Sequence, residues 1–312
     1  MNILITGGAG FIGSNLIGLF LEKNYNITVL DNFSTGKMQN IREYQNQIEI
    51  IEGDILNDFQ INVAAQKKEV VIHLAAMASV QKSIENPHLC NKINIDGTLN
   101  VLKAARLNSV KKVIFASSAA VYGNNPIVPK LETMLPEPMS PYAISKITGE
   151  YYCNLFSEIY NLQTVCFRFF NVYCPKQDPK SDYAAVIPIF ISKLLNNQQP
   201  VIYGDGEQTR DFININDLGN AIDKVINTDF ENNHLIVNLA NGEKTSVNQL
   251  YKIISTILNL NIEPLYLPKR EGDIIHSFAD ISKLNKEINF KPEINLEEGL
   301  KKTINYYLKD KE

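Results

Sequence analysis

The sequence lacks the features that mark several large classes of protein. Its four cysteines form no C-x-x-C pair, and no histidines, cysteines and carboxylates have the spacing of a metal site. We therefore expect reduced thiols and no bound metal. The basic residues are scattered and the net charge is −4, which argues against nucleic acid as a partner.

Signals for membranes and export are also missing. No apolar run reaches membrane-spanning length, so we expect no membrane partner. A strand-like run begins directly after Met1 and leaves no room for a signal peptide. Together with the unpaired cysteines, this predicts a cytoplasmic protein.

Short β-rich runs alternate with helical stretches through the first half of the chain, which has 312 residues and is 45% hydrophobic. The runs are continuously apolar, as expected for strands buried on both faces of a sheet. They are Ile3–Thr6, Ile27–Leu30, Ile48–Ile51, Val70–His73, Val113–Ala116 and Thr164–Phe167. This βαβ order predicts an α/β fold with a doubly wound parallel sheet.

The regular alternation stops after Asn171. Helix-like and strand-like pieces then mix without a repeating order. We expect residues 172–210 and 241–312 to form a smaller mixed α/β lobe that binds the substrate. Residues 1–171 plus 211–240 would form a dinucleotide-binding domain of Rossmann type.

A glycine-rich turn, Gly7-Gly8-Ala9-Gly10-Phe11-Ile12-Gly13, follows the first predicted strand and opens a helix. Gly7 permits the tight turn, Gly10 lets backbone amides approach a pyrophosphate, and Gly13 permits close helix packing. Asp31 ends the second strand, where a carboxylate would accept hydrogen bonds from ribose hydroxyls and repel a 2′-phosphate. The pattern predicts a dinucleotide site that holds NAD rather than NADP.

A tyrosine and a lysine four residues apart supply a candidate for catalysis. Tyr142 and Lys146 would lie on one face of a helix expected over 141–160. The ammonium would lower the pKa of the phenol, so Tyr142 could act as a base near neutral pH. A tyrosine and a lysine at this spacing are common by chance. Here, however, Ser118 ends the apolar run about 25 residues upstream. The serine, the tyrosine–lysine pair and the glycine-rich turn together favour a catalytic site.

These motifs resemble the extended short-chain dehydrogenase/reductase family, specifically its nucleotide-sugar (UDP-glucose/UDP-N-acetylglucosamine) 4-epimerase branch. The resemblance covers nearly the whole chain. It includes TGGAGFIGSNL at 6–16, DNFSTGK at 31–37, HLAA at 73–76, SSAAVYG at 117–123, YAISK at 142–146, RFFNVY at 168–173, YAAVIPIF at 183–190, YGDGEQTRDFI at 203–213 and REGDIIHSFADISK at 270–283.

The resemblance implies tightly bound NAD and a transient oxidation of the sugar. Tyr142 would take the proton of the C4 hydroxyl while a hydride passes from C4 to the nicotinamide. Ser118 would bind the developing oxyanion, and Lys146 would hold the ribose. The 4-keto sugar would then turn about its diphosphate and receive the hydride on its opposite face.

The resemblance also assigns ligand contacts. Residues expected to bind NAD are Gly7, Gly10, Phe11, Ile12, Gly13, Asp31, Asn32, Ser34, Thr35, Gly36, Asp54, Ile55, Leu74, Ala75, Ala76, Ala78, Asn94, Tyr142, Lys146 and Phe170. Residues expected to bind the UDP-sugar are Ser79, Ser83, Ser118, Tyr142, Asn171, Val186, Tyr203, Arg210, Arg270, Asp273 and Ser277. Asp54 fits an adenine contact and a helix cap equally well.

Ser277 carries the prediction about the sugar. In the family this position faces the C2 substituent, and a tyrosine there is associated with enzymes restricted to glucose and galactose. A small residue admits an N-acetyl group, because an acetamido group cannot share space with a phenol ring. The resemblance therefore implies UDP-N-acetylglucosamine/UDP-N-acetylgalactosamine as substrates, with UDP-glucose/UDP-galactose also accepted. Ser79 and Ser83 are expected either to contact the sugar or to act as cap and turn residues.

Three alternatives stay open. A UDP-glucuronic acid 4-epimerase would need a basic residue near C6, for which Lys82 is the nearby candidate. Related dehydratases and decarboxylases carry acidic groups where Ala119 and Ala120 stand, and an alanine cannot move a proton. A non-catalytic NAD-sensing protein would tend to lose the tyrosine or the lysine, and this chain keeps both.

The resemblance also implies a homodimer. Family members pair two helices per subunit into a four-helix bundle, which here would use residues of about 90–107 and 141–160.

Overall fold

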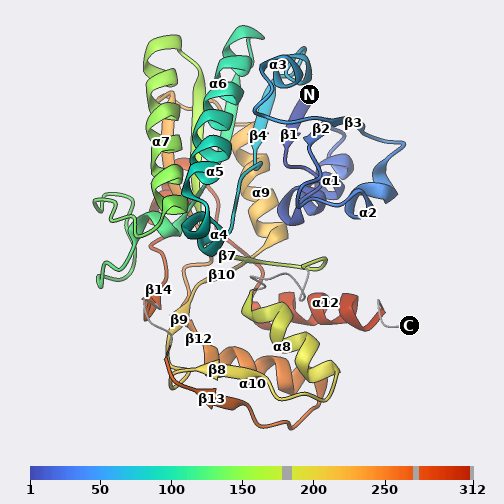
Figure 1. Ribbon diagram of the computed structural model, residues 1–312, viewed down its shortest axis with the longest axis vertical. Helices are drawn as coiled ribbons and strands as arrows, with labels where there is room; N and C mark the ends of the chain where they lie inside the picture. Colours follow the sequence, from blue (N-terminus) through green and yellow to red (C-terminus); the bar gives the residue numbers. More distant parts are fainter. Residues whose placement is uncertain (178–184, 270–273, 310–312) are drawn as a thin grey trace.

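The computed structural model describes residues 1–177, 185–269 and 274–309. Its centre is a seven-stranded parallel sheet in the order β11-β6-β5-β4-β1-β2-β3 (Figure 1). The strands are β1 (Asn2–Thr6), β2 (Asn26–Asp31), β3 (Glu49–Glu52), β4 (Val70–His73), β5 (Lys112–Ser118), β6 (Gln163–Phe169) and β11 (His234–Leu239). Each predicted apolar run coincides with one of the first six, so the predicted doubly wound parallel sheet is confirmed.

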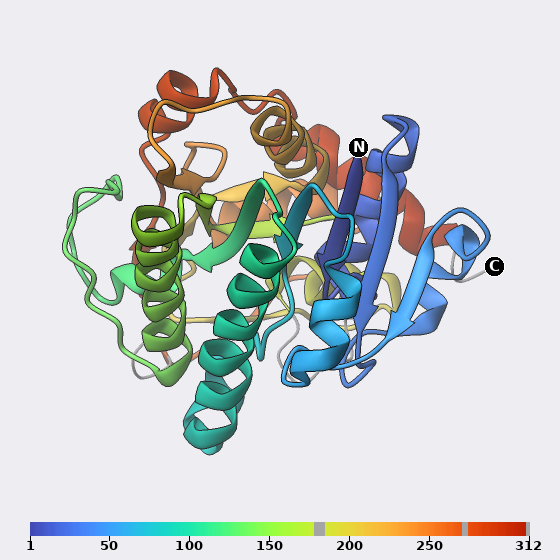
Figure 2. The ribbon, with the colours of Figure 1, turned by 90° about the horizontal axis from the view of Figure 1, so that it is seen from above.

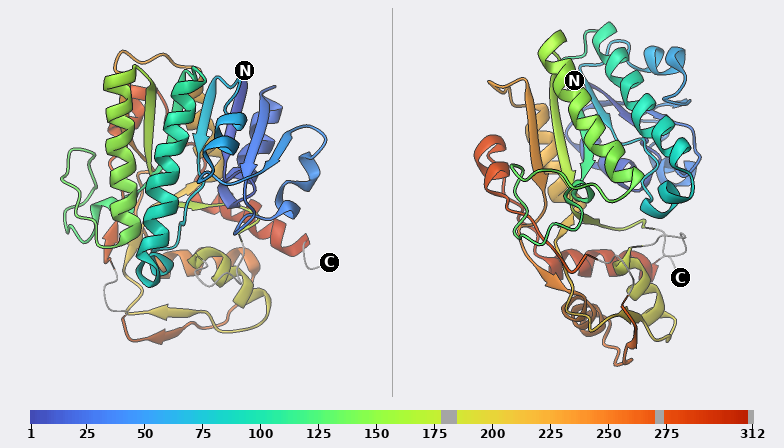
Figure 3. Two further views of the ribbon diagram at one scale, coloured as in Figure 1. Left: turned by 45° about the horizontal axis from the view of Figure 1, so that its top comes forward. Right: turned by 60° about the vertical axis from the view of Figure 1, so that its left-hand side comes forward.

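Helices cover both faces of this sheet (Figure 2). Side chains alternate along a strand, so Ile3 and Ile5 of β1 pack toward one face and Leu4 toward the other. The first face carries α1 (Phe11–Glu22), α2 (Met38–Ile41) and α9 (Ile215–Ile226). The second face carries α3 (Asp58–Ala64), α6 (Gly97–Leu107) and α7 (Pro141–Tyr160), and α6 and α7 lie side by side in both views of Figure 3.

Shorter pieces connect these elements. They are η1 (Arg42–Tyr44), α4 (Val80–Glu85), α5 (Pro87–Asn91), the π-helical stretch η2 (Lys92–Asp96) that leads into α6, and η3 (Ala119–Tyr122) after β5.

Helix α7 begins where the sequence predicts. The Ser140 side chain accepts a hydrogen bond from the Ala143 amide at 3.2 Å, and Pro141 occupies the first helical position, where no amide proton is needed. The helix ends at Asn161, whose φ of 55° is left-handed, a conformation that asparagine tolerates.

A smaller lobe lies below the sheet in the view of Figure 1 and has its own apolar core. Its helices are α8 (Val186–Leu195), α10 (Val247–Leu258) and α12 (Leu296–Lys309). Its strands are β8 (Val201–Tyr203) paired with β13 (Leu265–Leu267), and β9 (Thr209–Arg210) between β12 (Thr245–Ser246) and β14 (His276–Ser277). Helix α11 (Ser282–Ile288) packs beside β11 and α9.

The segment 211–240 divides between two sheets. Strand β11 joins the main sheet beside β6, as expected. Strand β10 (Phe212–Asn214) pairs instead with β7 (Asn171–Tyr173) in a separate two-stranded sheet. Where the dinucleotide-binding and substrate-binding domains divide stays a prediction.

Candidate active site

Three glycines shape the turn between β1 and α1. Gly7 has a φ of 73°, and a Cβ there would lie 2.7 Å from the Ala75 amide nitrogen. A Cβ on Gly13 would lie 2.6 Å from the Gly7 carbonyl oxygen, so α1 packs directly on the turn. Gly10 is the N-cap of α1 and provides no side-chain cap. Amides in the first turn of a helix have no intrahelical acceptor, and the dipole there is positive, so this end of α1 suits a diphosphate.

Asp31 ends β2 beside this turn. Its two carboxylate oxygens accept hydrogen bonds from the amides of Ala9 and Phe33, each at 2.9 Å. Burial raises the pKa of Asp31, and the two amides oppose that rise because they stabilise the carboxylate. A Cβ on Gly36 would lie 2.9 Å from both oxygens, so glycine keeps this corner open. A carboxylate has lone pairs to spare for ribose hydroxyls, and the residues present therefore fit a dinucleotide.

The residues predicted around the adenosine lie at the ends of β2 and β3. Asn32 donates from Nδ2 to Oδ2 of Asp54 at 3.0 Å, and Asp54 Oδ1 accepts from the Leu56 amide at 2.8 Å. Asp54 thus caps the turn that follows β3. Asn32, Ser34 and Thr35 are exposed, whereas Ile55 is buried. Their predicted contacts with NAD stay predictions.

Asn94 orders the loop after β4. Its Oδ1 accepts from the Met77 amide at 2.7 Å, and its Nδ2 donates to the Met77 carbonyl at 3.1 Å and to Ser145 Oγ at 2.9 Å. Asn94 is buried, within the π-helical stretch η2, a local irregularity that often marks functional sites. The loop 74–78, which carries four predicted NAD contacts, is thereby tied to α7. Because its polar atoms are bonded within the protein, a direct contact of Asn94 with NAD stays a prediction.

Ser118, Tyr142 and Lys146 meet at the carboxyl end of the sheet. Ser118 ends β5, and Tyr142 and Lys146 lie in the first turns of α7. The Lys146 Nζ lies 5.7 Å from the centre of the Tyr142 ring, which confirms that the two share a face of the helix. Lys146 also donates to the Ala116 carbonyl at 2.7 Å, so its ammonium is held between α7 and β5. The Ser118 hydroxyl lies close enough to hydrogen-bond the phenol.

The pKa of Tyr142 shifts in the direction opposite to the expected one. Burial raises it, because the phenolate loses solvation, and the Ser118 hydrogen bond opposes this rise. Burial also lowers the pKa of Lys146 to about 8, since the ammonium is disfavoured away from water. The prediction from spacing counted the attraction between the two side chains and left out their desolvation.

A buried ion pair that the sequence did not indicate lies behind these side chains. Arg168 on β6 donates from Nε and Nη2 to the two oxygens of Glu150 on α7, at 2.9 and 2.8 Å. Glu150 also accepts from the Ser117 hydroxyl at 2.5 Å. Because Ser117 precedes Ser118 and Glu150 lies one turn beyond Lys146, the pair joins the strand and the helix that carry the candidate catalytic groups. Its partners meet only when α7 packs against β5 and β6, so no local pattern reveals them.

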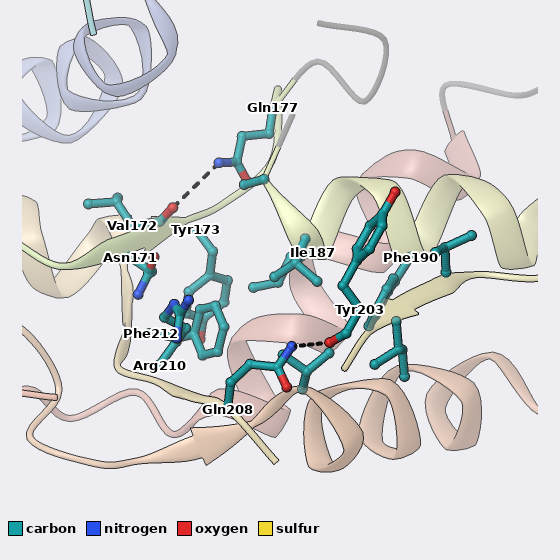
Figure 4. Close-up of a pocket in the computed structure, with 15 residues that line it drawn as sticks. Asn171, Val172, Tyr173, Gln177, Ile187, Phe190, Tyr203, Gln208, Arg210 and Phe212 are labelled. Atoms are coloured by element: carbon teal, nitrogen blue, oxygen red, sulfur yellow. Dashed lines mark hydrogen bonds between the residues drawn. The ribbon is translucent and has the colours of Figure 1, made fainter. Parts of the chain in front are cut away.

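A cavity of about 250 Å³ lies in the smaller lobe, next to β7 and β10 (Figure 4). Figure 4 shows Tyr203 and Phe190 on one side of the space and Asn171, Arg210 and Phe212 on the other. The predicted substrate residues that line it are Asn171, Val186, Tyr203 and Arg210.

Sequence reasoning missed several other residues that line this cavity. They include Gln177, Gln208, Phe212 and Val247. A signal was available for two of them, because Gln208 and Phe212 stand two residues on either side of Arg210. Extended backbone turns such residues to the same face.

Ser277 and Arg210 are neighbours across two strands. Ser277 on β14 is in register with Arg210 on β9, so the position predicted to sense the C2 substituent lies beside a predicted diphosphate anchor. Arg210 donates from Nη1 to the Thr209 carbonyl at 2.9 Å. The other predicted anchors, Arg270 and Asp273, lie outside the described residues.

The two serines after β4 take structural roles. The Ser79 side chain caps α4 by accepting from the Lys82 amide at 3.1 Å. Ser83 is buried, donates to the Val80 carbonyl at 2.5 Å and accepts from the Tyr142 amide at 3.1 Å. Ser83 therefore helps to place the start of α7, and direct contacts of these serines with a sugar stay predictions.

Residues 1–177, 185–269 and 274–309 contain neither a cluster of metal-ligating side chains nor a membrane-spanning helix. In these ranges no group of three or more histidine, cysteine, aspartate and glutamate side chains could hold a metal ion. None of the helices there is both long enough and apolar enough to cross a membrane.

The chain is similar to known proteins along its whole length. The sequence model of the family described as "NAD dependent epimerase/dehydratase family" matches residues 3–240. A UDP-glucose 4-epimerase of Mycolicibacterium smegmatis is 34% identical over 311 residues, which are 98% of each chain. A UDP-N-acetylglucosamine 4-epimerase from Methanobrevibacter ruminantium M1, solved with UDP-N-acetylmuramic acid, is 42% identical with a TM-score of 0.94, over 99% of this chain and 98% of that one. A Thermus thermophilus UDP-glucose 4-epimerase solved with NAD is 31% identical with a TM-score of 0.89, over 99% of both chains.

Proposed function

This chain belongs to the NAD dependent epimerase/dehydratase family, and from that premise we propose that it is a UDP-sugar 4-epimerase. The substrates proposed are UDP-N-acetylglucosamine/UDP-N-acetylgalactosamine, with UDP-glucose/UDP-galactose also accepted. The observation that carries the proposal is the meeting of Ser118, Tyr142 and Lys146 at the carboxyl end of β5 and the start of α7.

Each side chain has a task in this reaction. NAD, when bound, supplies a positively charged acceptor for the hydride of C4 and gives the hydride back. Tyr142 takes the proton of the C4 hydroxyl and returns it at the end. Ser118 donates a hydrogen bond to the C4 oxygen while negative charge develops there. The ammonium of Lys146 stabilises the phenolate form of Tyr142, and its bond to Ala116 keeps it in place.

The nucleotide has to stay anchored while the sugar turns. Arg210 suits the diphosphate, because a guanidinium is permanently charged and can bind two oxygens at once. Tyr203 and Phe212 offer ring faces for the base and the ribose. A small side chain at Ser277 leaves space for an acetamido group at C2. Ala119 and Ala120, at the start of η3, offer no group for the proton transfers of a dehydratase.

The test is an assay of purified protein with UDP-N-acetylglucosamine and, separately, UDP-glucose, without added cofactor. We expect inversion at C4, followed by NMR or chromatography, and release of NAD when the protein is denatured. Tyr142→Phe should still bind UDP-sugars and lose at least about 100-fold in turnover. If neither sugar is converted even with NAD supplied, the proposal is excluded, and uronic-acid nucleotides or a non-catalytic role become the next hypotheses.

We also propose that the protein is a homodimer, formed through the exposed sides of α6 and α7.

A further inference from the structure

Asp211 separates two residues of the substrate cavity without lining the cavity itself. Arg210 and Phe212 both line it, and alternation along extended backbone turns the residue between them to the opposite face. The Asp211 side chain is buried there with 0% exposure. A carboxylate so far from water is costly unless its oxygens are hydrogen-bonded, so its partners indicate what it is for.

Its partners are backbone amides from two distant segments. Oδ1 accepts from the Asn241 amide at 2.8 Å, and Oδ2 accepts from the amides of Gly242 at 3.0 Å and Ala279 at 3.2 Å. The Asp211 backbone carbonyl accepts from Asn171, through its amide at 3.0 Å and its side-chain Nδ2 at 3.1 Å. Asp211 is thus hydrogen-bonded to the segments that follow β11 and β14 and to the start of β7.

Those segments carry the parts of the substrate site. Ala279 comes two residues after Ser277, and Ser277 is in register with Arg210. Gly242 lies in the turn that leads to Thr245, which pairs with Arg210 from the other side. The bonds of Asp211 therefore fix the three-stranded sheet β12-β9-β14 at the point where the diphosphate anchor and the C2 position meet.

The three amide hydrogen bonds to the Asp211 side chain require a carboxylate as the acceptor. Three amides converge on two oxygens, and a side-chain amide would offer only one acceptor oxygen and would turn an NH₂ group toward an amide donor. Burial raises the pKa of Asp211 to about 7, and the three amides oppose that rise.

We propose that Asp211 is a positioning residue that sets the affinity for the UDP-sugar, because it holds Arg210 and Ser277 in register without touching the substrate. This inference rests on the proposed function. The groups that perform the chemistry lie on β5 and α7. Loss of the Asp211 hydrogen bonds should therefore weaken binding of the UDP-sugar far more than it slows the chemical step.

The experiment compares Asp211→Asn with Asp217→Asn. Asp217 is a matched control, because it too is buried and accepts backbone hydrogen bonds, from Glu293 at 3.2 Å and Ile294 at 2.9 Å. It lies in α9 and does not line the cavity. The measurements are KM and kcat with both sugar nucleotides, and binding of UDP alone by calorimetry, at a temperature where thermal melts show both variants folded.

For Asp211→Asn we expect KM for both sugar nucleotides and Kd for UDP to rise at least about tenfold, while kcat changes less than about threefold. The preference between acetylated and plain sugars should also change, because Ser277 loses its fixed position. Asp217→Asn should lose thermal stability and keep the wild-type KM and Kd. If Asp211→Asn does not fold, Asp211→Glu keeps the charge, moves the oxygens by one methylene and should show the same rise in KM.

Wild-type KM and Kd in a folded Asp211 variant would overturn the inference. An equal rise in KM for Asp217→Asn would overturn it too, because the effect would then follow from general destabilisation. Either result leaves the proposed function intact as long as wild-type protein epimerises the sugars. Absence of turnover in the wild type would instead contradict the proposed function. The UDP calorimetry would still test whether Asp211 sets the affinity for the nucleotide.

Discussion

At the scale of single residues, the acid–base behaviour of Tyr142 follows from two opposing effects. Burial raises the pKa of its phenol, whereas Ser118 and a charged Lys146 favour the phenolate. The proposed reaction needs the deprotonated phenol, so the active fraction should grow as pH rises toward that pKa. Lys146, with a pKa of about 8, is needed in its charged form, and this fraction falls as pH rises further.

We therefore predict that kcat/KM rises with pH through the neutral range, passes a maximum on the alkaline side and then falls. The profile should be measured between about pH 6 and pH 10 with saturating cofactor, since such profiles report the essential acid and base of the free enzyme. As a control, the affinity for UDP should be measured over the same pH range. It should show no matching rise, because UDP binding does not use Tyr142. A flat kcat/KM profile would contradict the role of Tyr142 as the base.

A second residue-scale prediction concerns Ser277. Replacing it with tyrosine should lower kcat/KM for UDP-N-acetylglucosamine at least about 100-fold and leave that for UDP-glucose within a few-fold, because the ring fills the space of the acetamido group. Ser277→Ala is the matched control and should preserve both activities. The readout is the ratio of kcat/KM for the two sugars, and equal loss of both would show that Ser277 does not set the C2 pocket.

At the scale of elements, the buried Glu150–Arg168 pair couples helix α7 to strand β6. Its side chains are 0% and 3% exposed, so neither charge has water as an alternative partner. We predict that Glu150→Gln lowers the free energy of unfolding by about 3–5 kcal/mol, because Arg168 is left buried without its counter-charge. Urea unfolding monitored by circular dichroism measures this loss.

An exposed ion pair supplies the control for that prediction. Lys301 and Glu297, one turn apart on α12, are 56% and 60% exposed, and Glu297→Gln should change stability by less than about 1 kcal/mol. Equal unfolding midpoints for the two variants would contradict the proposed importance of the buried pair.

The elements also show how far the sequence could predict the structure. The strands, the start of α7 and the glycine-rich turn were predictable, because each depends on residues close together in the chain. The bonds of Asp211 and the Glu150–Arg168 pair join residues that meet only after strands have paired, so no local spacing marks them. The rise in the pKa of Tyr142 was missed for a similar reason, since burial depends on the whole fold.

At the scale of the whole molecule, the chain forms a large lobe around the parallel sheet and a smaller lobe below it (Figure 1). Ser118, Tyr142 and Lys146 lie at the carboxyl edge of the large sheet, and the cavity is lined by residues of the smaller lobe together with β7 and Phe212 of β10. The segment 211–214 belongs to neither lobe alone, because Phe212 lines the cavity, Asp211 accepts a hydrogen bond from Asn241 just beyond the end of β11, and the strand pairs with β7. The division expected from sequence, residues 1–171 plus 211–240 against 172–210 plus 241–312, stays a prediction, and β10 pairs with β7 outside the main sheet.

The outer face of α7 supplies the last prediction. Ile144, Tyr151, Leu155 and Ile159 are 47%, 63%, 43% and 59% exposed and follow one another at intervals of seven, four and four residues. That spacing puts them on one stripe of the helix. Helix α7 itself lies beside α6 (Figure 3). A continuous exposed apolar stripe is unusual on a monomer and typical of a helix that packs against another copy.

We therefore predict a dimer at micromolar concentration by size-exclusion chromatography with light scattering. The double substitution Tyr151→Glu and Leu155→Glu should convert it to a monomer, because charges in the centre of a helical interface lose their hydration when the helices pack. Leu265→Glu is the control, since that residue is 45% exposed on β13, in the smaller lobe at the opposite end of the molecule, and should leave the dimer intact. A monomeric wild type, or a dimer that survives both charges on α7, would show that this stripe is not the interface.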